Sequence, residues 1–283
     1  MAKAPHSFKR LVLGLQPGAP TRVFSLAARL AELLDLELLG LFLEDTSLRD
    51  LAAVPFAREL RSLNGGWHRI DLDRLSRDID YAARNVERMF AEAAKNLPTG
   101  HEFEVVRGPL TSLLPSLSRR GDIVMIVEPA NPAERASQQF AWLIDAAFRS
   151  AAAVMIVPPR VWRSTGPVIA IAAQAGDPSL EGAAAIARAA GEALVVADLG
   201  AMPIDQTEIG RLAAATSGQV RRFTAGLRAR ADIGALDHAL HEFQERLLVV
   251  TRGTYDNRGV ASLASRRGVP VLVVEPAAGE AAA

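Results

Sequence analysis

Short apolar runs alternate with amphipathic segments along almost the whole chain. The run at 11–15 ends in a Gly/Pro turn and precedes an Ala-rich amphipathic segment at 22–34. This order is typical of a buried parallel strand that leads into a helix. The same reasoning predicts ten strands, at 11–15, 36–43, 102–107, 122–129, 153–159, 168–173, 193–199, 219–223, 246–251 and 269–274.

The turn after the first predicted strand occurs a second time in the chain. Gln16, Gly18 and Pro20 match Gln174, Gly176 and Pro178 at one constant spacing. The order of apolar runs is also the same on both sides, so each half reads β-α-β-α-β-α-β-α-β. The pattern predicts an α/β protein of two tandem five-stranded parallel sheets with helices on both faces and right-handed crossovers.

The repeat sets the expected domain boundaries. We expect a first domain at 1–160 and a second at 164–283, joined by a Pro- and Gly-containing linker at 158–167. The halves differ mainly after their second strands, where a long insertion at 44–100 corresponds to only 200–218. Within the insertion, we expect a capped short helix at 47–50 and a turn at 64–66.

Helices are predicted from their apolar period. The longest is expected over 72–93, with apolar residues at Leu72, Leu75, Ile79, Ala82, Val86, Met89 and Ala93. Its apolar seam is suited either to packing on the sheet or to docking a partner. Further helices are expected at 134–150, 179–190, 233–245 and 260–267, and Gly40 indicates a close backbone approach within its strand.

The amino-acid composition narrows the range of functions that this protein can have. The 283 residues suit two domains with proper cores, and the absence of cysteine excludes thiolate nucleophiles and Cys-ligated metals. The net charge is zero, so we expect neither a nucleic-acid nor a membrane partner. The apolar run after Lys9 and Arg10 is too short for a signal peptide. A cytoplasmic protein is therefore expected.

Several stretches resemble the universal stress protein family. Residues 122–128, followed by a helix and by 150–158, resemble its C-terminal signature, and 267–276 resemble it again. The stretch from Gly108 and Pro109 through 121–124 resembles that family's third turn, third helix and fourth strand. The resemblance covers nearly the whole chain as a tandem pair.

The resemblance implies the adenine nucleotide alpha hydrolase-like fold, with sheet order 3-2-1-4-5. It also implies that the two halves pair through their fifth strands, as an intramolecular pseudo-dimer. Nucleotide-binding members hold ATP at the ends of strands one and four. They use an Asp in the first turn and a Gly-x2-Gly-x9-Gly-Ser/Thr loop after strand four.

This sequence departs from that pattern in both halves. Gln16 and Gln174 stand where the Asp would be. The loop at 128–135 has two prolines and no glycine, and Glu128 and Glu134 would repel phosphates. We expect no ATP in the first half. In the second half, 251–259 holds two glycines and two arginines, which suit either an anion site or a plain polar turn.

Other constellations give weaker signals. His238 and His241 are spaced to share a helix face, but no third metal ligand is apparent, so a solvated face is expected and no metal. Nucleic-acid binding has little support, because the basic run of Arg221, Arg222, Arg228 and Arg230 lacks interleaved aromatics. No nucleophile elbow occurs.

We therefore expect a non-catalytic ligand- or partner-binding protein with degenerate ATP loops, in stress response or signalling. The candidate ligand-binding residues are Gln16, Gly18, Gly108, Gln174, Gly176, Arg252 and Gly253. The repeated Gln-x-Gly-x-Pro turn is either purely structural or supplies a carboxamide to an uncharged polar ligand. No cofactor is firmly indicated, although ATP or a related nucleotide remains an alternative for the second half. The rival hypothesis is an interaction module, including a homodimer formed through the long helix.

Overall fold

The structure is a computed structural model of the chain. It describes residues 8–15, 21–44, 46, 50, 53–54, 56–60, 66–108, 116–150, 153–161, 163–200, 202, 204–216 and 219–276. The expected cap at 47–50 and turn at 64–66 lie largely outside these residues, and so do Gln16 and Gly18.

The described elements of the two halves follow the predicted order. The first half contains β1 (Arg10–Leu15), α1 (Thr21–Leu34), β2 (Glu37–Glu44), β3 (Arg58–Leu60), β4 (Trp67–Arg69), α3 (Leu72–Ala94), β5 (His101–Arg107), β6 (Asp122–Val127), α5 (Pro132–Arg135), α6 (Gln138–Phe148) and β7 (Ala153–Val157). The second half contains β8 (Val168–Ala172), α7 (Pro178–Ala190), β9 (Leu194–Asp198), α8 (Gln206–Thr216), β10 (Val220–Thr224), α9 (Leu227–Ala231), α10 (Ile233–Ala239), β11 (Leu247–Thr251), α11 (Asn257–Arg267) and β12 (Val271–Val274).

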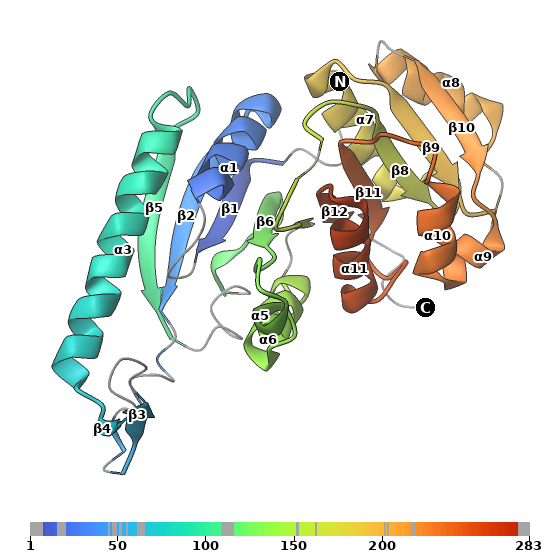
Figure 1. Ribbon diagram of the computed structural model, residues 1–283. Coiled ribbons are helices and arrows are strands. Elements are labelled where there is room, and N and C mark those ends of the chain that lie inside the picture. The colour runs from blue at the N-terminus through green and yellow to red at the C-terminus, as the bar shows by residue number, and fades with distance from the viewer. Residues whose placement is uncertain are drawn as a thin grey trace.

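One ten-stranded sheet runs through both halves, in the order β10-β9-β8-β11-β12-β7-β6-β1-β2-β5 (Figure 1). Each half is a parallel sheet of order 3-2-1-4-5, which confirms the predicted topology. The fifth strands join the halves, since β12 pairs antiparallel with β7 and Leu272 lies opposite Met155. Because the junction is antiparallel, the carboxyl ends of the strands lie at opposite edges of the sheet in the two halves.

Helices cover both faces of this sheet. Alternate strand residues enter two separate apolar cores, so that Leu11 and Leu13 face one layer and Val12 faces the other. The first layer is formed by α1, α3, α7 and α8, and the second by α6, α9, α10 and α11. Each core contains residues of both halves, so burial of apolar surface holds the halves together on both faces of the sheet.

The long helix α3 packs on the sheet over its C-terminal part. Val86 and Phe90 are buried, and the ring of Phe90 lies 5.6 Å from that of Phe103 on β5. Gly40 on β2 permits this packing, because a Cβ there would lie 2.9 Å from each of these two rings. The predicted close approach at Gly40 is confirmed. Towards the N-terminal end of α3, Tyr81 is 69% exposed.

Two predicted helices differ from the structure, and one hairpin was not predicted. The helix expected at 134–150 is two helices, because Ser137 caps α6 by accepting a hydrogen bond from the amide of Phe140. The helix expected at 233–245 ends at Ala239. The insertion contains an unpredicted hairpin, β3 and β4, which projects beyond the N-terminal end of α3 (Figure 1). Its three-residue strands are too short for a clear alternation of apolar and polar residues.

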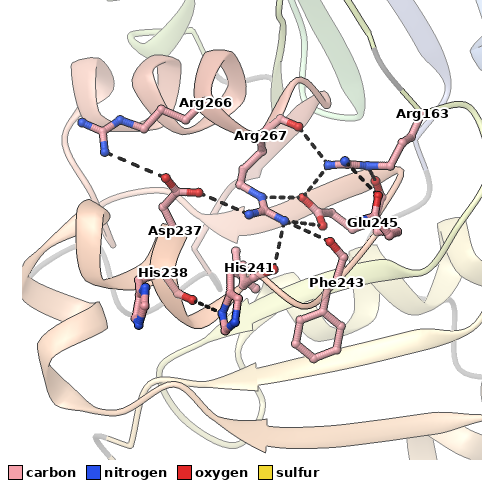
Figure 2. Close-up of polar contacts among 10 residues, drawn as sticks. Arg163, Asp237, His238, His241, Phe243, Glu245, Arg266 and Arg267 are labelled. Carbon is pink, nitrogen blue, oxygen red and sulfur yellow. Dashed lines mark hydrogen bonds and ion pairs between the residues drawn. The ribbon is translucent and has the colours of Figure 1, made fainter.

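A buried ionic network fixes the linker to the second half (Figure 2). Glu245, which is fully buried, accepts two hydrogen bonds from Arg267, at 2.8 and 2.9 Å. Arg163 of the linker donates to the backbone carbonyls of Glu245 (2.7 Å) and Arg267 (2.9 Å). Because Glu245 and Arg267 precede β11 and β12, the network holds the amino ends of these strands.

Candidate functional site

The first half brings Gly108 to the corner between β2 and β5. Gly108 is buried, and its amide donates a hydrogen bond to the carbonyl of Glu44 at the end of β2 (3.1 Å). Glu44 in turn pairs with Arg107 at 2.8 Å. Gly108 therefore lies two strands away from β1, after which Gln16 and Gly18 come in the chain. A joint site of these three residues stays a prediction.

In the second half, one carboxylate closes the space between the ends of β8 and β11. Asp177 is 4% exposed and caps α7. Its Oδ2 accepts from the amide of Ala173 (2.9 Å), and its Oδ1 accepts from the amide (3.0 Å) and the hydroxyl (2.8 Å) of Ser179. The hydroxyl of Thr251, at the end of β11, donates to the same Oδ1. The turn after β8 is thus fastened directly to the end of β11.

Three predicted residues lie in the turns at this edge. Gly176 has φ +74° and Gly253 has φ +90°, conformations that favour glycine, and a Cβ at either position would meet no atom within 4 Å. The carbonyl of Gln174 accepts from the amide of Asp177 (3.3 Å), and Pro178 begins α7. This confirms the structural interpretation of the Gln-x-Gly-x-Pro turn in its second copy. A ligand contact by Gln174 stays a prediction.

The fourth predicted residue, Arg252, reaches across to the first half. Its Nη1 donates to the carbonyls of Phe148 and Ser150 at the end of α6, and its Nη2 lies 2.7 Å from a carboxylate oxygen of Glu275. The guanidinium also lies over the ring of Phe148, 5.7 Å from its centroid. Burial lowers the pKa of Arg252 and raises that of Glu275. These contacts bind the two halves at the seam, the junction of β7 and β12 together with α6 and α11 above it.

A groove of about 390 Å³ follows this seam between α6 and α11. Its lining comes from both halves: Glu128, Arg135, Ala136, Ser137, Phe140, Ala141, Ile144, Asp145, Asn257, Arg258, Ala261, Ser262 and Ser265. The side-chain amide of Asn257 donates to Asp145 (3.1 Å) across the groove. Beyond this bridge, a second hollow of about 370 Å³ includes Arg252, Gly253 and Tyr255.

Glu128 is the most deeply buried charged group of the groove. It is 4% exposed, and its Oε2 accepts a hydrogen bond from the hydroxyl of Ser265 on α11. Burial raises the pKa of Glu128, while the Ser265 hydrogen bond and the charge of Arg135 act in the opposite direction. The other oxygen, Oε1, has no hydrogen-bond donor within the described ranges of the chain.

Sequence reasoning noticed Glu128 only as a residue that would repel phosphate. It missed Asp177, Asp145, Asn257 and Ser265. Asp177 had a readable signal, since an Asp immediately before Pro178 is a common helix cap. The other three had none, because the groove is assembled from residues more than a hundred positions apart in the chain.

The histidine pair and the basic run, which gave weaker signals in the sequence, lie at surface positions. The rings of His238 and His241 stack at 5.3 Å, and Nδ1 of His241 lies 2.7 Å from the carbonyl of His238 (Figure 2). Within the described residues, no group of three or more His, Asp or Glu side chains is arranged to hold a metal ion. Arg222 pairs with the buried Asp198 at 2.8 Å. In the described part of the chain, no helix has the length and apolar character needed to cross a membrane.

These features define a tandem α/β protein in which two halves of the same strand order share one sheet. The fold is that of a universal stress protein from Archaeoglobus fulgidus, which matches at a TM-score of 0.59 and 13% identity over 94% of this chain and 96% of that chain. At such low identity the likeness shows the fold alone. No family model matches the sequence, and no curated protein matches it.

Two further structures are similar at lower scores. One is a proposed universal stress protein from Pseudomonas aeruginosa, with a TM-score of 0.48 and 14% identity over 95% of this chain and 94% of that chain. The other is the cytoplasmic domain of a prokaryotic cation chloride cotransporter, with a TM-score of 0.49 and 10% identity over 94% of this chain and 95% of that chain.

Proposed function

We propose that the protein acts by binding a small ligand without catalysis, in stress response or signalling, and that neither half holds ATP through the loops of nucleotide-binding universal stress proteins. One observation carries the proposal. Each half has a carboxylate that is only 4% exposed beside the end of its first or fourth strand: Asp177 follows β8 and Glu128 follows β6. In each case the carboxylate lies near the place where the resemblance expects phosphate groups.

The physical argument is electrostatic and steric. A triphosphate needs consecutive backbone amides and positive charge, and a buried carboxylate beside it is repulsive. Asp177 further occupies the amides of Ala173 and Ser179, two donors that a ligand at the start of α7 would otherwise use. Arg252, which follows Thr251 at the end of β11, donates to carbonyl groups at the seam.

Calorimetric titration with ATP and Mg²⁺ tests the proposal. We expect no saturable heat at ATP concentrations up to about 1 mM. A dissociation constant of about 1 mM corresponds to a standard binding free energy of about −4 kcal/mol. Asp177→Asn and Glu128→Gln are companion variants that remove each negative charge. ATP binding by the unmodified protein at micromolar concentration, or ATP hydrolysis, would overturn the proposal.

A retained nucleotide site in the second half is the alternative function. It is favoured by Gly176 and Gly253, whose open Cβ positions leave room for a ligand to approach the backbone. Such a site would require the Thr251 hydroxyl and the Asp177 carboxylate to separate. Crystals soaked with ATP would then show density over the turns of these two glycines.

The interaction module is a further alternative, favoured by exposed aromatic side chains on the insertion and α3. Phe56 is 83%, Trp67 64% and Tyr81 69% exposed. Light scattering coupled to size exclusion measures whether this surface forms a homodimer. A monomeric mass over the full concentration range would remove the homodimer.

A further inference from the structure

The groove between α6 and α11 presents opposite charges that do not neutralise each other. Glu128 and Arg135 both line it, and the charge of Arg135 acts on Glu128, yet no ion pair joins these two described residues. The guanidinium of Arg135 makes no hydrogen bond or ion pair with any described side chain. One carboxylate oxygen and one guanidinium are thus left available in the same hollow.

The second carboxylate oxygen of Glu128, Oε1, accepts no hydrogen bond from the described residues and is open to the groove, where a ligand can reach it. A residue that is 4% exposed pays a desolvation cost, which is recovered only when the carboxylate accepts well-placed hydrogen bonds or faces a positive charge. Ser265 supplies one neutral donor to Oε2. An ammonium group in the groove would supply the charged donor that Oε1 lacks.

The end of the groove that contains Arg135 favours an anion. The first turn of α6 lines it through Ser137, Phe140 and Ala141, and this turn contains no acidic residue. The backbone amides at the N-terminus of an eleven-residue helix carry partial positive charge. Arg135, two residues before the cap Ser137 of α6, adds a full positive charge.

Between and beside these charges the walls are apolar. Phe140 and Ile144 of α6 face Ala261 of α11 across the groove. The volume of about 390 Å³ falls in the range of roughly 300–1,000 Å³ that is usual for small-molecule sites. A ligand with an apolar body attached to the carbon that bears its two charges would match this arrangement.

We propose that the seam groove binds a free α-amino acid with an apolar side chain. Its ammonium group pairs with Glu128, its carboxylate lies between Arg135 and the N-terminus of α6, and its side chain contacts Phe140, Ile144 and Ala261. A phosphate ester is excluded from this position by Glu128, and a simple organic cation by Arg135. The inference rests on the proposed ligand-binding function and assigns a site and a ligand class to it.

The site would exist only because both halves are in one chain. Glu128, Arg135 and α6 come from the first half, whereas Ser265 and Ala261 come from α11 of the second. A ligand that contacts both helices would link their positions. Binding would therefore stabilise the seam itself, which gives the proposal a readout in unfolding as well as in heat.

Calorimetric titration of the full chain tests the proposal with L-leucine, L-methionine and L-phenylalanine. At least one is expected to bind saturably below 10 mM (about −2.7 kcal/mol or stronger). The amide of that amino acid, which lacks the carboxylate, and its N-acetyl form, which lacks the ammonium, should each bind at least about tenfold more weakly (~1.4 kcal/mol).

Matched variants connect each ligand charge to its residue. Glu128→Gln and Arg135→Gln should each weaken binding of the free amino acid at least about tenfold, a loss of ~1.4 kcal/mol. Arg135→Gln should leave the affinity for the amide unchanged, and Glu128→Gln that for the N-acetyl form. Glu242→Gln and Arg266→Gln, at exposed side chains outside the groove, are the controls and should bind normally.

Three results would overturn the inference: no saturable heat with any of the three amino acids, equal binding of the amide, or an affinity that neither groove variant changes. Circular dichroism confirms that each variant is folded before titration. The ATP titration of the same preparation is a separate measurement. ATP binding would contradict the proposed function, whereas missing amino-acid binding without ATP binding would contradict this inference alone.

Discussion

Glu128 and Arg252 occupy equivalent positions in the two halves and carry opposite charges. Each is the first residue after its fourth strand, and the amide of each donates to the last residue of the neighbouring fifth strand, Glu128 to Val157 and Arg252 to Val274, both at 2.8 Å. Each side chain then crosses the seam, Glu128 to Ser265 on α11 and Arg252 to the carbonyls at the end of α6. The repeat thus places one charged side chain on each side of the junction, the buried Glu128 and the partly buried Arg252.

Glu128 should make the stability of the protein depend on pH. Burial raises its pKa above the ordinary value of 4.5, so the unfolded chain releases this proton at lower pH than the folded protein does. The contribution of Glu128 to the free energy of unfolding is fully present below about pH 4.5. It is lost as the pH rises through the pKa of Glu128 in the folded protein. Glu128→Gln removes the effect. In paired urea titrations from pH 4 to 8, the variant should gain stability relative to the parent as pH rises.

The pH test has an internal control in Glu275, whose pKa burial also raises. Glu275 is present in both proteins, so its contribution cancels in the difference. Parallel stability curves for parent and variant would contradict the assigned effect of Glu128.

Arg252 should contribute strongly to the seam. Arg252→Ala leaves the carbonyls of Phe148 and Ser150 without this donor and Glu275 without its ion-pair partner. We expect a loss of about 2–4 kcal/mol in the free energy of unfolding. Arg266→Ala is the matched control, because its side chain is 54% exposed and its ion pair with Asp237 is long, at 3.9 Å. Urea denaturation should show a change within about 0.5 kcal/mol for the control. Equal effects of the two variants would contradict the role of Arg252.

The hydrogen bond between Thr251 and Asp177 should appear as a coupling energy. Asp177→Ala removes a helix cap and the bridge to β11, and Thr251→Val removes the bridge from the other side. The double variant should lose less stability than the two single variants together, by about 1–3 kcal/mol. A complete double-mutant cycle in urea measures this value, and additive losses would show that the bridge contributes nothing.

Sequence reasoning predicted the fold of this chain much better than its candidate site. The inner strands could be predicted because both of their faces are buried, so that a run such as Ile123 to Val127 is continuously apolar. The break before α6 could not be predicted, since it depends on Ser137 accepting one backbone hydrogen bond within an otherwise helical pattern. The seam groove depends on which helices meet across the β7–β12 junction, and local periodicity carries no information about that contact.

Gly40 should tolerate no side chain as large as valine. A Cβ there lies 2.9 Å from atoms of Phe90 and Phe103, so Gly40→Val must displace packed rings. Overpacking of this kind costs about 1–3 kcal/mol, which thermal or urea unfolding measures. Phe103→Leu in the Gly40→Val background should recover part of the loss, because it removes one of the two obstructing rings. Gly210→Ala on α8, where a Cβ meets no atom within 4 Å, is the control and should be tolerated.

Glu245 should be among the residues whose substitution costs most stability. It is fully buried, and it pairs with Arg267 at 2.8 Å and with Arg163 at 3.3 Å, as Figure 2 shows. Glu245→Gln keeps the shape but leaves two partly buried guanidinium groups without their shared counter-charge. Breaking a buried pair in this way costs about 3–5 kcal/mol.

The test is urea unfolding of Glu245→Gln beside Glu242→Gln, whose carboxylate is 81% exposed. The exposed variant should change the free energy of unfolding by less than about 0.5 kcal/mol. Arg163→Met measures the contribution of Arg163 to the network separately from that of Arg267. Since Arg267 retains both of its own hydrogen bonds to Glu245 and those to the carbonyls of Leu240 and Phe243, losing Arg163 should cost less than losing Glu245. A larger loss for Arg163→Met than for Glu245→Gln would show that the linker, and not the carboxylate, holds this end of the second half together.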